Sequence, residues 1–177
     1  MSLSVAELNA LSERDATREL AACCGSSRWI MGMAARRPFP SREAVLFAAD
    51  EVWDGLAAAD WLEAFAHHPR IGEAHAAAAS PESERWAAGE QSRAAEADAG
   101  VKRELAAAQR EYEERFGHIF LICATGKTAA DILAAARARM HNDADTELRV
   151  AADEQRQITR LRLEKLLSTL EPAERSA

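Results

Sequence analysis

Two adjacent histidines stand directly before a proline in residues 65–73, FAHHPRIGE. An imidazole titrates close to neutral pH, so a histidine held in one orientation can act as a general acid or base. Pro69 disfavours helical backbone at His68, and a helix that enters this segment should therefore end near His67. Gly72 allows a sharp turn soon afterwards. The pattern indicates a bend that presents a side chain, although two solvated histidines at a helix end would fit it too.

Charged residues surround this bend. Asp60 is expected to be the N-cap of the helix before it, with Glu63 as the return partner of a capping box. Arg70 and Glu73 follow the histidines within the same segment. These neighbours favour a functional site over a pair of solvated histidines.

A second candidate lies in residues 86–91, WAAGEQ. Residues three and four positions apart share a helical face, so Glu90 and Gln91 should project together beside Ala87. A glutamate and a glutamine on one face are also commonly solvated, and this alternative stays open.

A third candidate is Arg162 in residues 157–167, QITRLRLEKLL. Ile158 and Leu166 lie four residues to either side of it, which places Arg162 within an apolar stripe, whereas Arg160 lies on another face. An arginine in such a stripe either extends its charge to solvent or meets a buried anion. A ligand carboxylate is one anion that the guanidinium group binds well.

Length and composition indicate a helical globular protein. The 177 residues suffice for one domain that buries about 70% of the surface of its unfolded form. Only 8 glycines and 5 prolines, with abundant Ala, Leu, Glu and Arg, favour helices over strands. The formal net charge of −7 argues against a nucleic-acid partner. There is no apolar run of about 20 residues and no export signal at the start, so we expect a cytoplasmic protein without a membrane contact. Three cysteines, two of them adjacent, fit a reducing compartment.

Capping and helix-ending residues divide the chain into about eight helices. Ser4 with Glu7 should open the first of them as a capping box, and Gly25 should end the second. Residues 118–126, HIFLICATG, are apolar without helical periodicity and are expected to form a buried extended connector. The remaining helices are expected over residues 26–38, 41–55, 60–67, 81–117 with a kink at Gly100, 128–140 and 145–170. We therefore predict an all-α, single-domain helical bundle over residues 1–177.

Two other motifs carry less weight. Residues 124–131, ATGKTAAD, resemble the end of a phosphate-binding loop, but Leu121 stands where that motif needs a glycine. A turn whose Thr128 caps the next helix is the better interpretation. The histidines and cysteines lack the spacings typical of zinc sites, so we expect no metal site.

Four segments together resemble the signature blocks of a known family. HHPRIGE, WAAGEQ, YEERFGHIFLICATGKTAADIL and ITRLRLEKLL are similar, in order and spacing, to blocks of the 2-oxo-4-hydroxy-4-carboxy-5-ureidoimidazoline (OHCU) decarboxylases. The resemblance spans about residues 5–170. This family carries out the last step of oxidative urate breakdown to (S)-allantoin and consists of cofactor-free, all-helical homodimers. The resemblance thus implies a carboxy-lyase with a small-molecule substrate, no cofactor and a second copy of the chain as partner.

The resemblance also implies which residues form the site. His68 matches the catalytic histidine, so that His67 is only its neighbour. Glu90 matches the active-site glutamate, and Arg162 matches the substrate-binding arginine. The remaining matches to substrate-binding positions are Pro69, Ala87, Gln91, Ile119, Phe120, Leu121 and Ile122.

One position departs from the family. Ala87 stands where the family usually has serine, and loss of that hydroxyl would weaken substrate binding by about 1 kcal/mol. Either Ser83, one turn earlier on the same face, or a water molecule could replace it.

The family's reaction suggests a role for each group. The C=N bond of the substrate ring can accept the electron pair that departing CO2 leaves, so no cofactor is needed as an electron sink. We expect Arg162 to anchor the anionic substrate and His68 to protonate one face of the ring. Glu90 would orient the ring, and Gln91 would bind its amide edges. A weakened family member that binds a ureido-imidazole without turnover is the alternative, and Ala87 is its basis. A purely structural helical protein is a third, less favoured interpretation.

Overall fold

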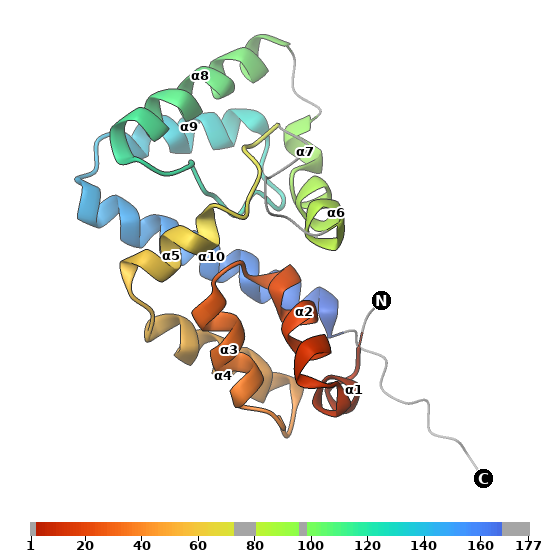
Figure 1. Cartoon of the computed structure of the whole chain (residues 1–177). Coiled ribbons are helices and arrows are strands. Elements are labelled where there is room, and N and C mark those ends of the chain that lie inside the picture. The colour runs from red at the N-terminus through yellow and green to blue at the C-terminus, as the bar shows by residue number, and fades with distance from the viewer. Residues whose placement is uncertain (1–2, 73–80, 96–98, 168–177) are drawn as a thin grey trace.

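The computed structural model describes residues 3–72, 81–95 and 99–167, and these fold into helices joined by short loops without a strand (Figure 1). The prediction of an all-α fold is confirmed. The helices are α1 (Val5–Ala10), α2 (Glu13–Cys23), α3 (Ser27–Ala35), α4 (Arg42–Asp54), α5 (Ala58–Phe65), α6 (Pro81–Glu90), α7 (Ser92–Ala95), α8 (Ala99–Phe116), α9 (Ala129–Arg139) and α10 (Ala144–Leu166).

Local capping chemistry begins most helices where the sequence predicts. Ser4 accepts the backbone N–H of Glu7 at 3.2 Å, and the Glu7 carboxylate accepts the Ser4 N–H at 2.7 Å. Thr128 and Asp131 form the same reciprocal pair at the start of α9, which confirms the capped turn in residues 124–131. Ser41 caps α4 through the N–H of Ala44.

The start of α5 corrects one prediction. The N-cap is Ala57, and Asp60 occupies the third helical position, where its carboxylate accepts the Ala57 N–H at 2.9 Å. Glu63 instead accepts the N–H and the hydroxyl of Ser27 at 3.0 and 2.6 Å. Glu63 therefore links α5 to α3. Its carboxylate is available for this contact because it does not cap its own helix.

The end of α2 corrects a second prediction. Gly25 does not adopt the left-handed conformation of a helix-ending glycine, and Cys24 is the C-cap with extended backbone. The reason for a glycine is space. A Cβ atom on Gly25 would lie 2.3 Å from Cγ of His67, so only glycine lets the His67 ring pack against this turn.

The predicted helix over residues 81–117 is interrupted. It divides into α6, α7 and α8, with a break at Gln91, and Gly100 lies inside α8. Residues 96–98 fall outside the described part, as do Glu73 of the bend and the predicted final turn at 168–170.

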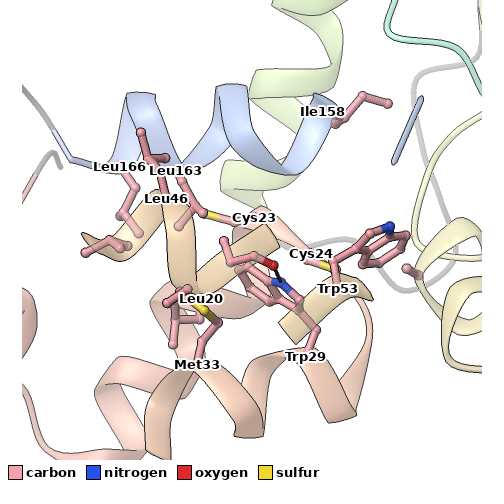
Figure 2. Packing of buried hydrophobic residues seen from close by; sticks show 14 of the residues in the cluster. Leu20, Cys23, Cys24, Trp29, Met33, Leu46, Trp53, Ile158, Leu163 and Leu166 are labelled. Atoms are coloured by element: carbon pink, nitrogen blue, oxygen red, sulfur yellow. Dashed lines mark hydrogen bonds between the residues drawn. The ribbon is translucent and has the colours of Figure 1, made fainter. Parts of the chain in front are cut away.

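The long helix α10 connects the two ends of the molecule. It packs against α2, α4 and α5, while α8 packs against α9 at the opposite end (Figure 1). Figure 2 shows the first hydrophobic cluster, in which Leu20 of α2, Trp29 of α3 and Leu163 of α10 meet. The indole N–H of Trp29 donates to the carbonyl of Ala49 at 3.2 Å, so this buried polar group is satisfied. A second cluster lies between α8 and α9 and includes Leu105, Tyr112 and Ile132.

The connector between α8 and α9 joins the two clusters. Leu121 and Cys123 belong to the first cluster, while Phe120, Ile122 and Ala124 belong to the second. Alternation of this kind is typical of extended backbone buried on both sides, which explains an apolar run without helical period. The prediction of a buried connector is confirmed. None of the helices in the described ranges is long and apolar enough to cross a membrane.

Candidate functional site

The histidine-proline bend begins where α5 ends. The N–H groups of His67 and His68 donate to the carbonyls of Ala64 and Phe65 at 3.2 and 3.0 Å, which closes the last turn. Pro69 follows and cannot donate a further backbone hydrogen bond. The helix thus ends within two residues of the predicted position.

Three side chains from other parts of the chain hold the rest of the bend. Gln109 of α8 accepts the Ile71 N–H at 2.8 Å and donates to the Ile71 carbonyl at 3.0 Å. Gln91 accepts the N–H of Gly72, whose φ of 88° is the left-handed value that the sequence predicted for a turn. Arg70 forms a two-pronged ion pair with Glu113, at 2.6 and 2.8 Å. The segment after the proline is therefore held by long-range contacts, whereas the residues before it are held by the last turn of α5.

The two histidines have different surroundings. His68 is buried, with 8% of its surface exposed. His67 is half-buried, with Nδ1 2.9 Å from the Glu63 carbonyl oxygen and its ring against Gly25. The alternative of two solvated histidines is therefore wrong for His68.

His68 faces a pocket formed by four parts of the chain. The pocket is enclosed by the bend, the end of α6, the connector and one residue of α10. Its free volume is about 10 Å³, room for about one water molecule, so side chains must move to admit a larger ligand. The lining residues are His68, Pro69, Ile71, Ala87, Glu90, Gln91, Phe120, Leu121, Ile122, Ala124 and Ile158.

A larger cavity adjoins this pocket. It has a volume of about 600 Å³ and shares Ile71 and Gln91 with the pocket. Cavities of this size are typical of small-molecule sites. Lys102 and Arg110 of α8 also line it. This cavity offers a basic approach to the pocket.

Glu90 forms a buried ion pair with Arg162. Nε and Nη2 of Arg162 donate to the two oxygens of Glu90 at 3.3 and 3.1 Å, and Nη1 donates to the hydroxyl of Ser83 at 3.0 Å. The side chains of Arg162 and Glu90 are 3% and 8% exposed. The buried anion that Arg162 meets is thus Glu90, and Arg162 reaches the pocket through Glu90 rather than lining it.

Lys165 adds a second cation to this cluster. Its ammonium group lies 2.9 Å from Oε1 of Glu90, and its side chain is 40% exposed. One carboxylate against Arg162 and Lys165 leaves one net positive charge. A cluster with that charge favours an anionic ligand next to the pocket.

The connector presents its backbone to the pocket. Arg139 of α9 donates to the Leu121 carbonyl at 2.8 Å, and Glu154 of α10 accepts the Cys123 N–H at 2.7 Å. Arg139 is itself paired with buried Glu147, which also accepts the hydroxyl of Tyr112. These contacts hold the connector rigidly against the pocket.

Two backbone N–H groups of the connector are candidates for binding a ligand. Within the described ranges, the N–H groups of Leu121 and Ile122 donate to no other group, although both residues are buried. Buried N–H groups normally have an acceptor. These donors can therefore serve a carbonyl or carboxylate of a ligand.

The electrostatic surroundings keep His68 neutral. Burial, and then the positive charge of Arg162, lower the pKa of His68 to about 3, while contact with Gln155 acts in the opposite direction. The expectation of a His68 pKa near neutral pH is therefore wrong. A neutral imidazole can accept a proton, and its conjugate acid would be a strong donor.

The structure brings together nearly all of the predicted site residues. Ile119 is outside the pocket; it packs on the first cluster and lines a separate hollow with Phe65 and His118. Arg160 is solvent-exposed and pairs with Asp50 and Glu164. This agrees with the prediction that Arg160 and Arg162 lie on different faces of the helix.

Sequence reasoning did not identify Lys165 or Gln109. The spacing of Lys165, one helical turn after Arg162, indicated that the two side chains share a face of the helix. Gln109 gave no comparable signal, because its partner lies 38 residues away. The described residues contain no group of three or more side chains arranged to hold a metal ion.

Comparison with known proteins gives a consistent result. The family model of OHCU decarboxylase matches residues 9–164. The bifunctional uric acid degradation protein TTL of Arabidopsis thaliana is 41% identical over 147 residues, which cover 82% of this chain but only 45% of that protein. The chain thus spans less than half the length of this relative.

Two solved structures are similar. A crystal structure of OHCU decarboxylase in the presence of (S)-allantoin is 38% identical, with a TM-score of 0.73 over 84% of this chain and 96% of that one. A crystal structure of (S)-allantoin synthase has a TM-score of 0.69 over 94% of this chain and 54% of that one. At 15% identity, the second likeness concerns the fold alone.

Proposed function

This chain belongs to the OHCU decarboxylase family, and we propose that it is a carboxy-lyase that converts OHCU to (S)-allantoin in urate degradation. The observation that carries the proposal beyond family membership is the shared pocket of His68 and Glu90, next to a cluster with net positive charge. A proton-transfer group and an anion-binding group are the two elements that this decarboxylation requires.

The substrate carboxylate would be attracted by the cluster of Arg162, Lys165 and Glu90. Within the described part of the chain, Glu90 and Ser83 bind three of the five N–H donors of Arg162, so the other two can turn toward a ligand. The unused N–H groups of Leu121 and Ile122 would bind the ring oxygen or the ureido carbonyl. In this scheme Glu90 holds the guanidinium in place and also orients the substrate hydroxyl.

We assign the proton transfer to His68. Loss of CO2 moves an electron pair from the broken C–C bond into the ring, toward the C=N nitrogen, which then takes a proton from solvent. The resulting enol still carries its hydroxyl proton. Neutral His68 would accept this proton and deliver it to the adjacent ring carbon, forming the carbonyl and the C–H bond of allantoin. Because the bend holds the His68 imidazole on one side of the pocket, the proton reaches one face of the substrate ring and a single enantiomer of allantoin results.

Pro69 and Gln91 support this geometry in the proposed scheme. Pro69 limits the backbone at His68, and Gln91 holds Gly72 while its amide N–H groups remain available to the substrate. Phe120 and Ile122 enclose the ring and exclude water. Ile119 would contribute only through the backbone of the connector.

The missing serine hydroxyl at Ala87 has a replacement within reach. Ser83 is buried and accepts a hydrogen bond from Arg162 at 3.0 Å, so a hydroxyl group already lies at the anion-binding cluster. This contact favours Ser83 over a water molecule as the substitute. It also favours an active enzyme over the alternative of a binding module without turnover.

Circular dichroism tests the proposed function. Urate, uricase and hydroxyisourate hydrolase generate the substrate in place, with or without this protein. We expect the protein to accelerate the appearance of one allantoin enantiomer. A binding module would delay the spontaneous decay without selecting an enantiomer, and a structural protein would change neither rate nor optical activity.

We further propose, from the family, that the chain acts as a homodimer in the cytoplasm, that residues 1–177 form one domain and that catalysis needs no cofactor. Sedimentation analysis and activity after exhaustive dialysis against a chelator test the dimer and the cofactor.

A further inference from the structure

Gln155 of α10 is fully buried beside the proposed site. Its relative exposure is 0%, and its carboxamide contacts the side chain of His68. In the described part of the chain, no group donates a hydrogen bond to its Oε1 atom. An unpaired carboxamide oxygen in a protein interior is costly, so its retention suggests a role.

The other end of this carboxamide is held in one orientation. Nε2 of Gln155 donates to the hydroxyl of Thr159 at 3.1 Å, one turn further along α10. The Thr159 side chain also acts on the buried thiol of Cys24 and lowers its pKa, against the burial that raises it. Thr159 and Cys24 are both buried, with 3% and 1% exposure. Because Thr159 binds the nitrogen, the oxygen is the end of the carboxamide that is left to interact with His68.

We propose that Gln155 is a positioning residue for His68: its carboxamide oxygen accepts a ring N–H of His68 and leaves the other ring nitrogen bare toward the pocket. Within the described residues this contact is looser than a hydrogen bond, and catalytic contacts of this kind often tighten when substrate binds. The role is that of a group that selects the tautomer and orientation of a catalytic histidine. Gln155 does not touch the substrate.

This arrangement has a second consequence for the imidazolium. Once His68 takes up a proton, both ring nitrogens are donors, and one of them meets the oxygen of Gln155. Contact with Gln155 raises the pKa of His68, against burial and Arg162, which lower it. Gln155 thus stabilises the protonated ring where its surroundings otherwise disfavour it.

The direct test is a titration of His68 by NMR of its imidazole, which needs no turnover and so does not depend on the proposed function. Gln155→Glu places a carboxylate at the carboxamide position and should raise the pKa of His68 by about one to three units. Gln157→Glu makes the same change on the exposed face of α10 and should leave the pKa of His68 unchanged. An unchanged His68 pKa in Gln155→Glu would overturn the inference.

The kinetic test rests on the proposed function. Gln155→Met keeps the size of the side chain but removes the acceptor. It should lower kcat about 10- to 100-fold, as loss of groups that orient metal-binding histidines does, with KM little changed. A variant that folds and turns over at the wild-type rate would contradict the inference. If Gln155→Met does not fold, the titration of Gln155→Glu still decides the matter.

Discussion

The buried pair of Glu90 and Arg162 gives the sharpest prediction for stability. Glu90→Gln keeps the shape of the side chain but removes the negative charge that two cations share. Arg162 would then remain buried, 3% exposed, without a counter-ion. Because solvent cannot reach its guanidinium group, the unpaired charge destabilises the folded state. The unfolded state, in which Arg162 is hydrated, is not affected.

The size of this loss follows from the two contacts. Removal of one partner from a buried ion pair costs about 3–5 kcal/mol. The pair with Lys165 adds at most about 1 kcal/mol, because the Lys165 side chain is 40% exposed. The glutamine oxygen can still accept a hydrogen bond from Arg162, so we expect the lower end, a loss of about 3 kcal/mol.

Urea denaturation of the two variants of this cluster measures the difference. Lys165→Met removes the exposed partner of the same carboxylate and should lower the free energy of unfolding by less than about 1 kcal/mol. Both values come from linear extrapolation with circular dichroism as the signal. If Glu90→Gln were no more destabilising than Lys165→Met, Arg162 would not be buried against Glu90, and the proposed anion-binding cluster would be wrong.

Four further predictions concern the arginines, the pH dependence of activity, the pH dependence of stability and the packing of the bend. Arg162→Ala should mainly raise KM, whereas Arg160→Ala should leave both kinetic constants nearly unchanged; similar effects would contradict the assignment of faces on α10. Because burial and the charge of Arg162 lower the pKa of His68 to about 3, kcat/KM should show no His68 inflection near pH 6.5 and should fall only toward pH 3. A protonation step near 6.5 would contradict a buried neutral imidazole. The same lowered pKa means that the unfolded chain binds this proton from about pH 6.5 downward, so folding stability should decrease as the pH falls from 6.5 toward 3. Gly25→Ala would bring Cβ to 2.3 Å from the His67 ring and should cost about 1–3 kcal/mol of stability together with activity, and a silent substitution would show that the bend tolerates displacement of His67.

Local chemistry made much of the fold predictable from the sequence. The caps at Ser4, Ser41 and Thr128 act within four residues, so their spacing in the chain is their spacing in space. The same reasoning failed at Asp60, because an acidic residue in the first turn serves equally well as N-cap or as third helical residue. The connector was recognisable because a segment buried on both sides has no helical period.

The partners of the site residues could not be read from the sequence. Arg162 binds Glu90 across 72 positions, and Gln109 binds Ile71 across 38. No local pattern encodes such pairings. The shift of the His68 pKa likewise depends on burial and on Arg162, which meet only in the folded chain. The residue types of the site were therefore predictable, whereas their ionic states were not.

The most direct measurement of the central claim is the optical activity of allantoin formed with His68→Asn. Asparagine keeps a polar side chain at the bend but cannot shuttle a proton at neutral pH. With helix content unchanged in the far-ultraviolet spectrum, we expect product to form at the spontaneous rate and as a racemate. Enantiomerically pure allantoin at the wild-type rate would show that another group delivers the proton.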